Sequence, residues 1–303
     1  MGSDAGILLL GANGQLGHEL QRTLAGLGRV TALDVPELDF TNAAALRGIV
    51  RAHRPQIIVN SAAYTAVDKA ESEPDLAFAV NAAAPGILAE EAKTLGACLV
   101  QYSTDYVFDG RKSAPYVEGD VPNPLSVYGR SKLEGERGAA GCPRHLIFRT
   151  SWVVGVHGHN FIKTMLRLAG ERETLRVVAD QHGAPTAAAL LAQVTADILM
   201  LMQRAPQGDL RWGLYHLVAG GETSWHGLAR HVIARAAARG LKLKAGPDAV
   251  AAITTADYPT PAARPANSRL DTAKLRAAFG VTLPDWRRGV DDIVDQLAAG
   301  AMA

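Results

Sequence analysis

The first half of the chain alternates short apolar runs with longer segments in which Ala and Leu recur at helical spacing. This alternation is typical of β-α units that wind around a mainly parallel sheet. The predicted strands are 7–10, 29–33, 56–59, 97–102 and 145–149, and the predicted helices are 15–27, 43–52, 75–95 and 126–139. The pattern therefore predicts an α/β fold with a doubly wound parallel sheet.

After Thr150 the regular pattern gives way to glycine-rich turns, a predicted helix at 161–169, an Ala-rich helix at 187–203 and a proline-rich stretch at 258–265. This change indicates a smaller, irregular C-terminal α/β region. We predict a nucleotide-binding domain at 1–150, rejoined by parts of 177–220 such as a short strand at 214–217. Residues 151–303 are predicted to form most of a substrate-binding domain.

Composition and charge narrow the class of protein. The chain has 303 residues, 48% of them hydrophobic and 20% charged, which is ordinary for a folded globular protein. A net charge of +1 provides no overall field that would attract nucleic acid or an anionic membrane. Cys98 and Cys142 lie far apart, without metal-ligand spacing, and no signal peptide or membrane-spanning run is evident. We expect a cytoplasmic protein, with a homodimer as the commonest assembly.

A glycine-rich turn follows the first predicted strand and opens the first predicted helix. Glycine at such a turn lets phosphate approach the backbone, and a dinucleotide pyrophosphate can then rest on the helix N-terminus. The strand-turn-helix-strand context favours a Rossmann-type cofactor site over a glycine turn without a ligand. The residues of this turn that we expect to bind the cofactor are Gly11, Asn13, Gly14, Gln15, Leu16 and Gly17.

Asp34 ends the second predicted strand, where a carboxylate can accept hydrogen bonds from the adenosine ribose. This position favours NADH. Arg22 on the first helix could turn inward toward a 2′-phosphate, so the sequence is also compatible with NADPH. Asp39 and Phe40 are expected to flank the adenine. The alternative for Asp34 is a strand end before the turn at Pro36.

A second set of polar residues indicates redox chemistry. Thr104 and Asp105 follow a predicted strand, and ligands of open α/β sheets gather at the carboxyl ends of strands. Tyr128 and Lys132 are four residues apart on a predicted helix and therefore share one face. A lysine ammonium beside the phenol is expected to lower the tyrosine pKa and make it a usable proton donor. Together with the glycine turn, these residues predict hydride-transfer chemistry.

The chain resembles the extended short-chain dehydrogenase/reductases and, within them, the dTDP-4-dehydrorhamnose reductases, nearly from end to end. The motifs that carry the resemblance are GANGQLG at 11–17, NSAAYTAVDKAE at 60–71, STDYVFDG at 103–110, YGRSKLEGE at 128–136, RTSWV at 149–153, NFIKTMLRLA at 160–169, DQHGAPT at 180–186, YHLVAGG at 215–221 and RPANSRLD at 264–271.

The resemblance implies that NADH or NADPH reduces the C4 keto group of a dTDP-linked 4-keto-6-deoxy sugar, giving dTDP-L-rhamnose. It implies Tyr128 as the proton donor, Thr104 on the C4 oxygen and Lys132 on the nicotinamide ribose. Further cofactor contacts are expected from Ala62, Ala63, Tyr64 and Thr65. The expected substrate contacts are Asp105 and Trp152 on the sugar, and Asn160, Arg264 and Asn267 on the nucleotide diphosphate. For Trp152 the alternative is a core aromatic near a domain seam.

The sequence also bears on three alternatives: a metal site between subunits, an epimerase or dehydratase, and a non-catalytic homologue. Some relatives are thought to pair subunits through a metal held by glutamates, and Glu19 lies where one is expected. Ala189 stands at the other position, so we predict no metal. An epimerase or dehydratase of the same superfamily is disfavoured because Tyr106, and not a glutamate, follows Thr104 and Asp105. A non-catalytic regulatory homologue would not need Thr104, Tyr128 and Lys132 together.

Overall fold

The computed structural model describes residues 5–205 and 208–302. Its centre is a six-stranded parallel sheet with strand order β10-β5-β4-β3-β1-β2. The strands are β1 (Ala5–Leu10), β2 (Gly28–Leu33), β3 (Ile57–Asn60), β4 (Cys98–Thr104), β5 (His145–Thr150) and β10 (Gly213–His216). The chain reverses its direction of winding between β1 and β3, and the carboxyl ends of these two strands flank the crevice where ligands of such sheets bind.

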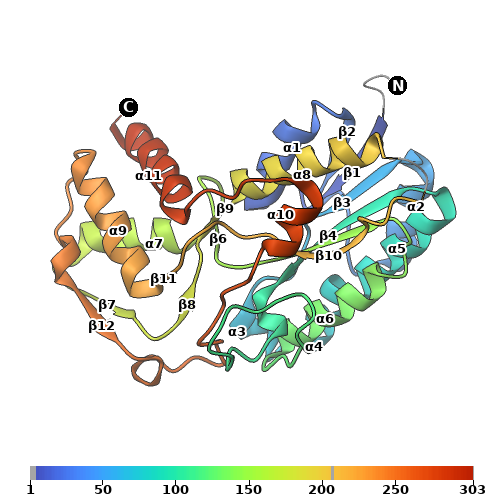
Figure 1. The fold of residues 1–303 in the computed structure, drawn as a ribbon. Helices are drawn as coiled ribbons and strands as arrows, with labels where there is room; N and C mark the ends of the chain where they lie inside the picture. The colour runs from blue at the N-terminus through green and yellow to red at the C-terminus, as the bar shows by residue number, and fades with distance from the viewer. Residues whose placement is uncertain (1–4, 206–207, 303) are drawn as a thin grey trace.

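Helices cover both faces of the sheet (Figure 1). Ile7 and Leu9 of β1 point to the face packed by α1 (Gln15–Leu24), α8 (Ala188–Gln203) and α10 (Ala273–Phe279). Leu8 and Leu10 point to the opposite face, which α2 (Ala43–His53), α5 (Ala84–Leu95) and α6 (Val127–Ala139) cover. Successive side chains of a strand face opposite ways, so a strand buried on both sides is apolar throughout.

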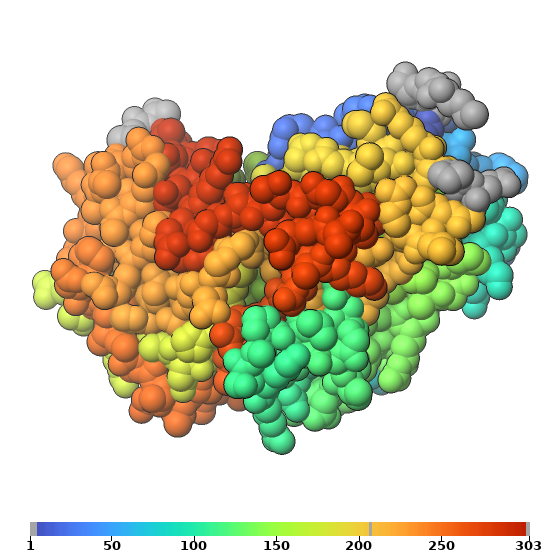
Figure 2. Space-filling model, viewed as in Figure 1, coloured from blue at the N-terminus to red at the C-terminus, as the bar shows by residue number. Residues whose placement is uncertain are grey.

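Segments that follow Thr150 form a smaller second lobe, whose core lies among α7 (Phe161–Glu171), α9 (Trp225–Ala238) and α11 (Trp286–Met302). Short strand pairs complete it: β7 (Leu175–Val178) with β12 (Val250–Ile253), β6 (Val153–Val154) with β9 (Thr186–Ala187), and β8 (His182–Gly183) with β11 (Thr223–Ser224). In the space-filling view, the orange and red C-terminal part of the chain extends from this lobe onto the sheet domain (Figure 2).

The structure confirms the doubly wound α/β fold and modifies several predicted elements. The helix predicted over 75–95 is divided into α4 (Pro74–Phe78), a π-helical turn (Ala79–Ala83) and α5. A short helix, α3 (Val67–Ala70), precedes them. The helix predicted to run to Leu27 ends at Leu24. The strand predicted over 214–217 is β10, which pairs with β5 and so returns the chain to the main sheet.

Helices α9, α10 and α11 were not predicted. Ser224 caps α9 by accepting a hydrogen bond from the backbone N–H of Gly227, which is a recognisable helix start. The Arg and Ala content of α9 obscured its apolar stripe. Within the described residues, no helix is both long and apolar enough to cross a membrane.

Candidate active site

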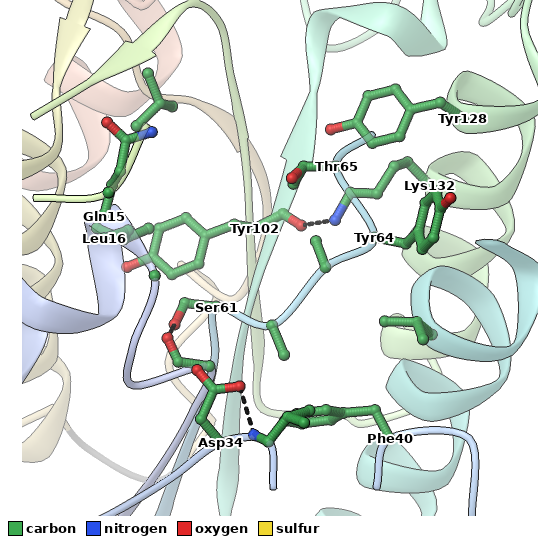
Figure 3. A pocket seen from close by; sticks show the side chains of 18 of the residues that line it. Gln15, Leu16, Asp34, Phe40, Ser61, Tyr64, Thr65, Tyr102, Tyr128 and Lys132 are labelled. Carbon is green, nitrogen blue, oxygen red and sulfur yellow. Dashed lines mark hydrogen bonds between the residues drawn. The ribbon is translucent and has the colours of Figure 1, made fainter. Parts of the chain in front are cut away.

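A cleft of about 680 Å³ lies at the carboxyl ends of the central strands, in the size range of small-molecule and cofactor sites. Figure 3 shows Gln15 and Leu16 on one side of it, Tyr128 and Lys132 from α6 on the other, and Asp34 and Phe40 at one end. The expected cofactor residues that line it are Gly11, Gly14, Gln15, Leu16, Asp34, Asp39, Phe40, Ala62, Ala63, Tyr64, Thr65, Tyr128 and Lys132.

The glycine turn is shaped by close backbone contacts. Gly11 has a φ of +81°, and a Cβ there would lie 2.4 Å from the backbone nitrogen of Ala62. Gly17 does not line the cleft: it is buried in α1, where a Cβ would lie 1.9 Å from the Gly11 carbonyl oxygen. The turn can therefore hold its shape only with glycine at both positions. This places the amides at the N-terminus of α1 beside the cleft, as a dinucleotide pyrophosphate requires.

Asp34 is fixed at the end of the cleft where Phe40 also lies (Figure 3). Its Oδ2 accepts a hydrogen bond from the backbone N–H of Asn13 at 2.7 Å, and its Oδ1 accepts one from Val35 at 2.8 Å. Asn13 itself does not line the cleft, and its backbone N–H orients the Asp34 carboxylate. Asp39 lines the cleft, yet its carboxylate also accepts from the backbone N–H and the hydroxyl of Thr41, which lowers the pKa of Asp39.

Tyr128 and Lys132 lie on the cleft side of α6, as expected for their spacing. The Lys132 ammonium donates to the backbone carbonyl of Tyr102 at 2.7 Å (Figure 3). Burial lowers the pKa of Lys132 to about 8, and the charge of Glu136 opposes this effect. The prediction that Lys132 lowers the pKa of Tyr128 is wrong for this structure: burial raises the Tyr128 pKa to about 12, opposed by the Thr104 hydroxyl. The phenol therefore holds its proton at neutral pH.

Thr104 ends β4 and Asp105 follows it, both buried. The Thr104 hydroxyl donates to Asp105 Oδ1 at 3.2 Å and accepts from the backbone N–H of Tyr106. Burial raises the pKa of Asp105 to about 6, opposed by hydrogen bonds with Ser268 and Thr104. Asp105 Oδ2 is buried without a partner among the described residues, so a polar ligand group could satisfy it.

Trp152 is held in an unusual conformation. Its φ is +49°, in the left-handed region where a bulky residue is strained. Its ring stacks on Trp225 with 3.7 Å between the centroids, and a Cβ on Gly183 would lie 2.8 Å from the ring. Trp225 in turn donates to Gln181 at 3.1 Å. The DQHGAPT motif thus supplies Gln181 and Gly183, which fix the position of the Trp152 indole.

The three residues expected to contact the diphosphate are all engaged within the protein. Asn160 caps α7, and its amide donates to Gln15 and to the backbone carbonyl of Gly155. Arg264 forms an ion pair with Asp68 at 2.7 Å. The amide of Asn267 donates to two backbone carbonyls of the 112–114 loop. Asn160 therefore positions the glycine turn and Asn267 secures a loop, and their phosphate contacts stay predictions.

Several cleft residues were not anticipated. Ser61 belongs to the NSAAYTA motif, and its hydroxyl donates to the carbonyl of Leu10 at the end of β1. Gly158 and His159 are exposed and also border the cleft. Only the packing of the second lobe against α1 reveals this. The other unpredicted lining residues are Val35, Thr41, Leu76, Val80, Tyr102, Thr150 and Val153.

Within residues 5–205 and 208–302, no group of three or more His, Cys, Asp or Glu side chains is arranged to hold a metal ion. Glu19 instead pairs with Arg22 at 3.2 Å on the surface of α1.

The doubly wound sheet, the glycine turn and the Tyr128–Lys132 pair at one cleft define an NAD(P)-dependent oxidoreductase of the extended short-chain dehydrogenase/reductase class. The family model described as RmlD substrate binding domain matches residues 5–299. The chain belongs to this family.

Relatives and solved structures agree with this assignment. A protein of Salmonella typhimurium named dTDP-4-dehydrorhamnose reductase is 49% identical over 296 residues, covering 96% of this chain and 97% of the relative. A crystal structure of a dTDP-4-dehydrorhamnose reductase from Clostridium acetobutylicum, 37% identical, superposes with a TM-score of 0.87 and covers 96% of this chain and 99% of that one. Another from Bacillus anthracis, solved in complex with NADP, is 36% identical with a TM-score of 0.86, covering 97% and 99%. These findings confirm the family and the fold class predicted from the motifs.

Proposed function

We propose that this chain reduces the C4 keto group of dTDP-4-dehydro-6-deoxy-L-mannose to a hydroxyl, giving dTDP-L-rhamnose, with NADH or NADPH as the reductant. The observation that carries the proposal is the single cleft that joins the glycine turn to Tyr128 and Lys132. The name shared by relatives of nearly full-length coverage supplies the substrate.

The residues of the cleft fit a nicotinamide dinucleotide. Gly11 and Gly17 leave room that a Cβ would fill, so the pyrophosphate can lie on the N-terminus of α1. Asp34 would accept from the adenosine ribose, and Lys132 would bind the nicotinamide ribose. When bound in its reduced form, the cofactor supplies the hydride that the keto carbon accepts.

Tyr128 would complete the reduction by donating its phenolic proton to the C4 oxygen. Because burial raises its pKa to about 12, the phenol is protonated at neutral pH and can donate to the oxygen that becomes the new hydroxyl. The Lys132 ammonium, held by the Tyr102 carbonyl, would then stabilise the phenolate. Thr104 beside the phenol would hydrogen-bond the same C4 oxygen and hold it within reach.

Asp105, Trp152 and Arg264 do not line the cofactor cleft itself, and they would contact the nucleotide sugar beyond it. The unpartnered Oδ2 of Asp105 suits a sugar hydroxyl, and the fixed indole of Trp152 suits the apolar face of a deoxysugar. Arg264 carries a positive charge that suits a diphosphate, provided that the substrate competes with Asp68.

The test is oxidation of NADH and NADPH with dTDP-4-dehydro-6-deoxy-L-mannose, comparing the native chain with Tyr128→Phe. We expect turnover by the native chain and a loss of roughly 10²–10⁴-fold in the variant, the usual contribution of a general acid. Tyr128→Phe should still bind the cofactor. A native chain that binds the cofactor without oxidising it would exclude the reductase function and favour a regulatory or epimerase role.

A further inference from the structure

Glu136 is a buried carboxylate to which the proposed reaction assigns no role. It lies one helical turn after Lys132 on α6, and its side chain is 7% exposed. Oε1 accepts from the Ser103 hydroxyl at 2.5 Å and from Arg149 Nε at 2.8 Å. Oε2 accepts from Arg149 Nη2 at 2.7 Å. Both oxygens are therefore occupied, and the carboxylate is held in one orientation.

These contacts join the helix that carries the proton donor to the strand that faces it. Tyr128, Lys132 and Glu136 follow one another at four-residue spacing, so they lie along one face of α6. On β4, Ser103 lies between Tyr102, whose carbonyl accepts from Lys132, and Thr104, which lies beside Tyr128. Glu136 thus fixes Ser103, the residue between the two positions of β4 that contact Lys132 and Tyr128.

Stability alone does not account for the buried ion pair between Glu136 and Arg149. Removing two charges from water is expensive, and a buried ion pair is often replaced by apolar residues without loss of stability. The Arg149 side chain is only 3% exposed, and its Nη1 has no partner among the described residues. The arrangement leaves one buried donor unsatisfied, so a role beyond holding the fold together is indicated.

Lys132 needs a negative charge near it. Its side chain is buried and its hydrogen bond is to a neutral carbonyl. The other ionisable groups around it are Tyr128 on its own helix, Asp105 after β4, Arg149 on β5 and Tyr64 after β3. Of these, the two phenols are neutral, Arg149 is positive, and the Asp105 carboxylate accepts from the Thr104 hydroxyl at 3.2 Å and makes no hydrogen bond to Lys132. The Glu136 charge is the one that favours the protonated form of Lys132.

We propose that Glu136 is a positioning residue for the reductase site. It holds Ser103 and the end of β4 against α6, and it keeps the Lys132 ammonium charged in the protein interior. The inference rests on the proposed function, because Lys132 must carry its charge to stabilise the Tyr128 phenolate.

The test is the pH dependence of kcat/KM for Glu136→Gln, with Glu134→Gln as the matched control. Glu134 lies on the same helix, but its side chain is 45% exposed and pairs with Arg137 on the surface. We expect the alkaline decline in activity to move to lower pH by roughly 0.5–1 unit in Glu136→Gln, because a nearby opposite charge is lost. In Glu134→Gln the alkaline decline should occur at the same pH as in the native chain. In Glu136→Asp it should occur close to that pH, because the negative charge is kept.

An unchanged alkaline decline in Glu136→Gln, accompanied by a lower unfolding temperature, would show a merely structural role and overturn the inference. If Glu136→Gln does not fold, the double variant Glu136→Gln with Arg149→Met leaves no unpaired buried charge and serves instead. The double variant should fold and show a smaller displacement in the same direction, because Arg149 contacts Glu136 and makes no hydrogen bond to Lys132. An undisplaced decline would also overturn the inference. Absence of turnover in the native chain would refute the proposed function instead.

Discussion

The side-chain nitrogen of Lys132 donates to the backbone carbonyl of Tyr102 at 2.7 Å, in an interior where Lys132 is only 4% exposed. Burial lowers the Lys132 pKa from its ordinary 10.5 to about 8. Between these two values the folded protein binds fewer protons than the unfolded chain, so stability from this group increases with pH. Below pH 8 the cost of burying the charge is fully present.

Lys132→Met should therefore stabilise the protein at pH 7 by on the order of 1–3 kcal/mol while it abolishes turnover. The Tyr102 carbonyl keeps a hydrogen bond from Gln101 at 2.9 Å, so the substitution leaves no buried acceptor without a partner. Urea unfolding at pH 7 and pH 10 measures the effect. The gain should shrink at pH 10, and a variant less stable than the native chain at pH 7 would contradict the prediction.

His216 should make the protein sensitive to acid. Burial, with the Arg149 charge, lowers the His216 pKa to about 3, and its Nδ1 contacts the carbonyl of Asp271 at 3.1 Å. Because the unfolded chain takes up the proton near pH 6.5, stability from this group is lost as the pH falls below that value. The loss is at most about 1.4 kcal/mol per pH unit.

His216→Asn keeps a donor near the Asp271 carbonyl and removes the titration. Urea unfolding at pH 7 and pH 5 should show a smaller loss of stability in this variant than in the native chain. Equal losses in the two proteins would mean that His216 is not buried in its neutral form.

Gly183→Ala should displace the Trp152 indole, since its Cβ would lie 2.8 Å from the ring. We expect KM for the nucleotide sugar to rise roughly tenfold, with little change in KM for NADH, as is usual when a positioned contact is lost. Gly170→Ala is the matched control, because a Cβ there meets nothing within 4 Å. A rise in KM for NADH as large as that for the sugar would place Trp152 on the cofactor instead.

Gly17→Ala should weaken cofactor binding by roughly tenfold or more, because its Cβ would lie 1.9 Å from the Gly11 carbonyl and force the turn open. Gly48→Ala, in the open on α2, should bind NADH normally and be slightly more stable. Fluorescence titration with NADH measures both affinities. Normal binding by Gly17→Ala would show that the turn does not set the cofactor site.

The sequence by itself determined the sheet domain and most of the cofactor cleft. Strands such as β1 are buried on both faces and therefore appear in the sequence as continuous apolar runs. The glycine turn and the spacing of Tyr128 and Lys132 are local features, so their positions follow from the chain alone. Helices α9 and α11 bury their apolar sides against each other and α10 buries its side against β10, so their burial depends on contacts that are distant along the chain.

Tertiary structure alone decided the charge state and partners of the site residues. The pKa of Tyr128 depends on how deeply the cleft buries it, and no spacing along α6 contains that information. The same holds for Asn160 and Asn267, whose amide donors are taken by Gln15 and by the 112–114 loop. The contact between Glu136 on α6 and Arg149 on β5 forms only when the helix packs on the sheet. Burial and long-range contacts are properties of the folded chain, so they could not be predicted from local pattern.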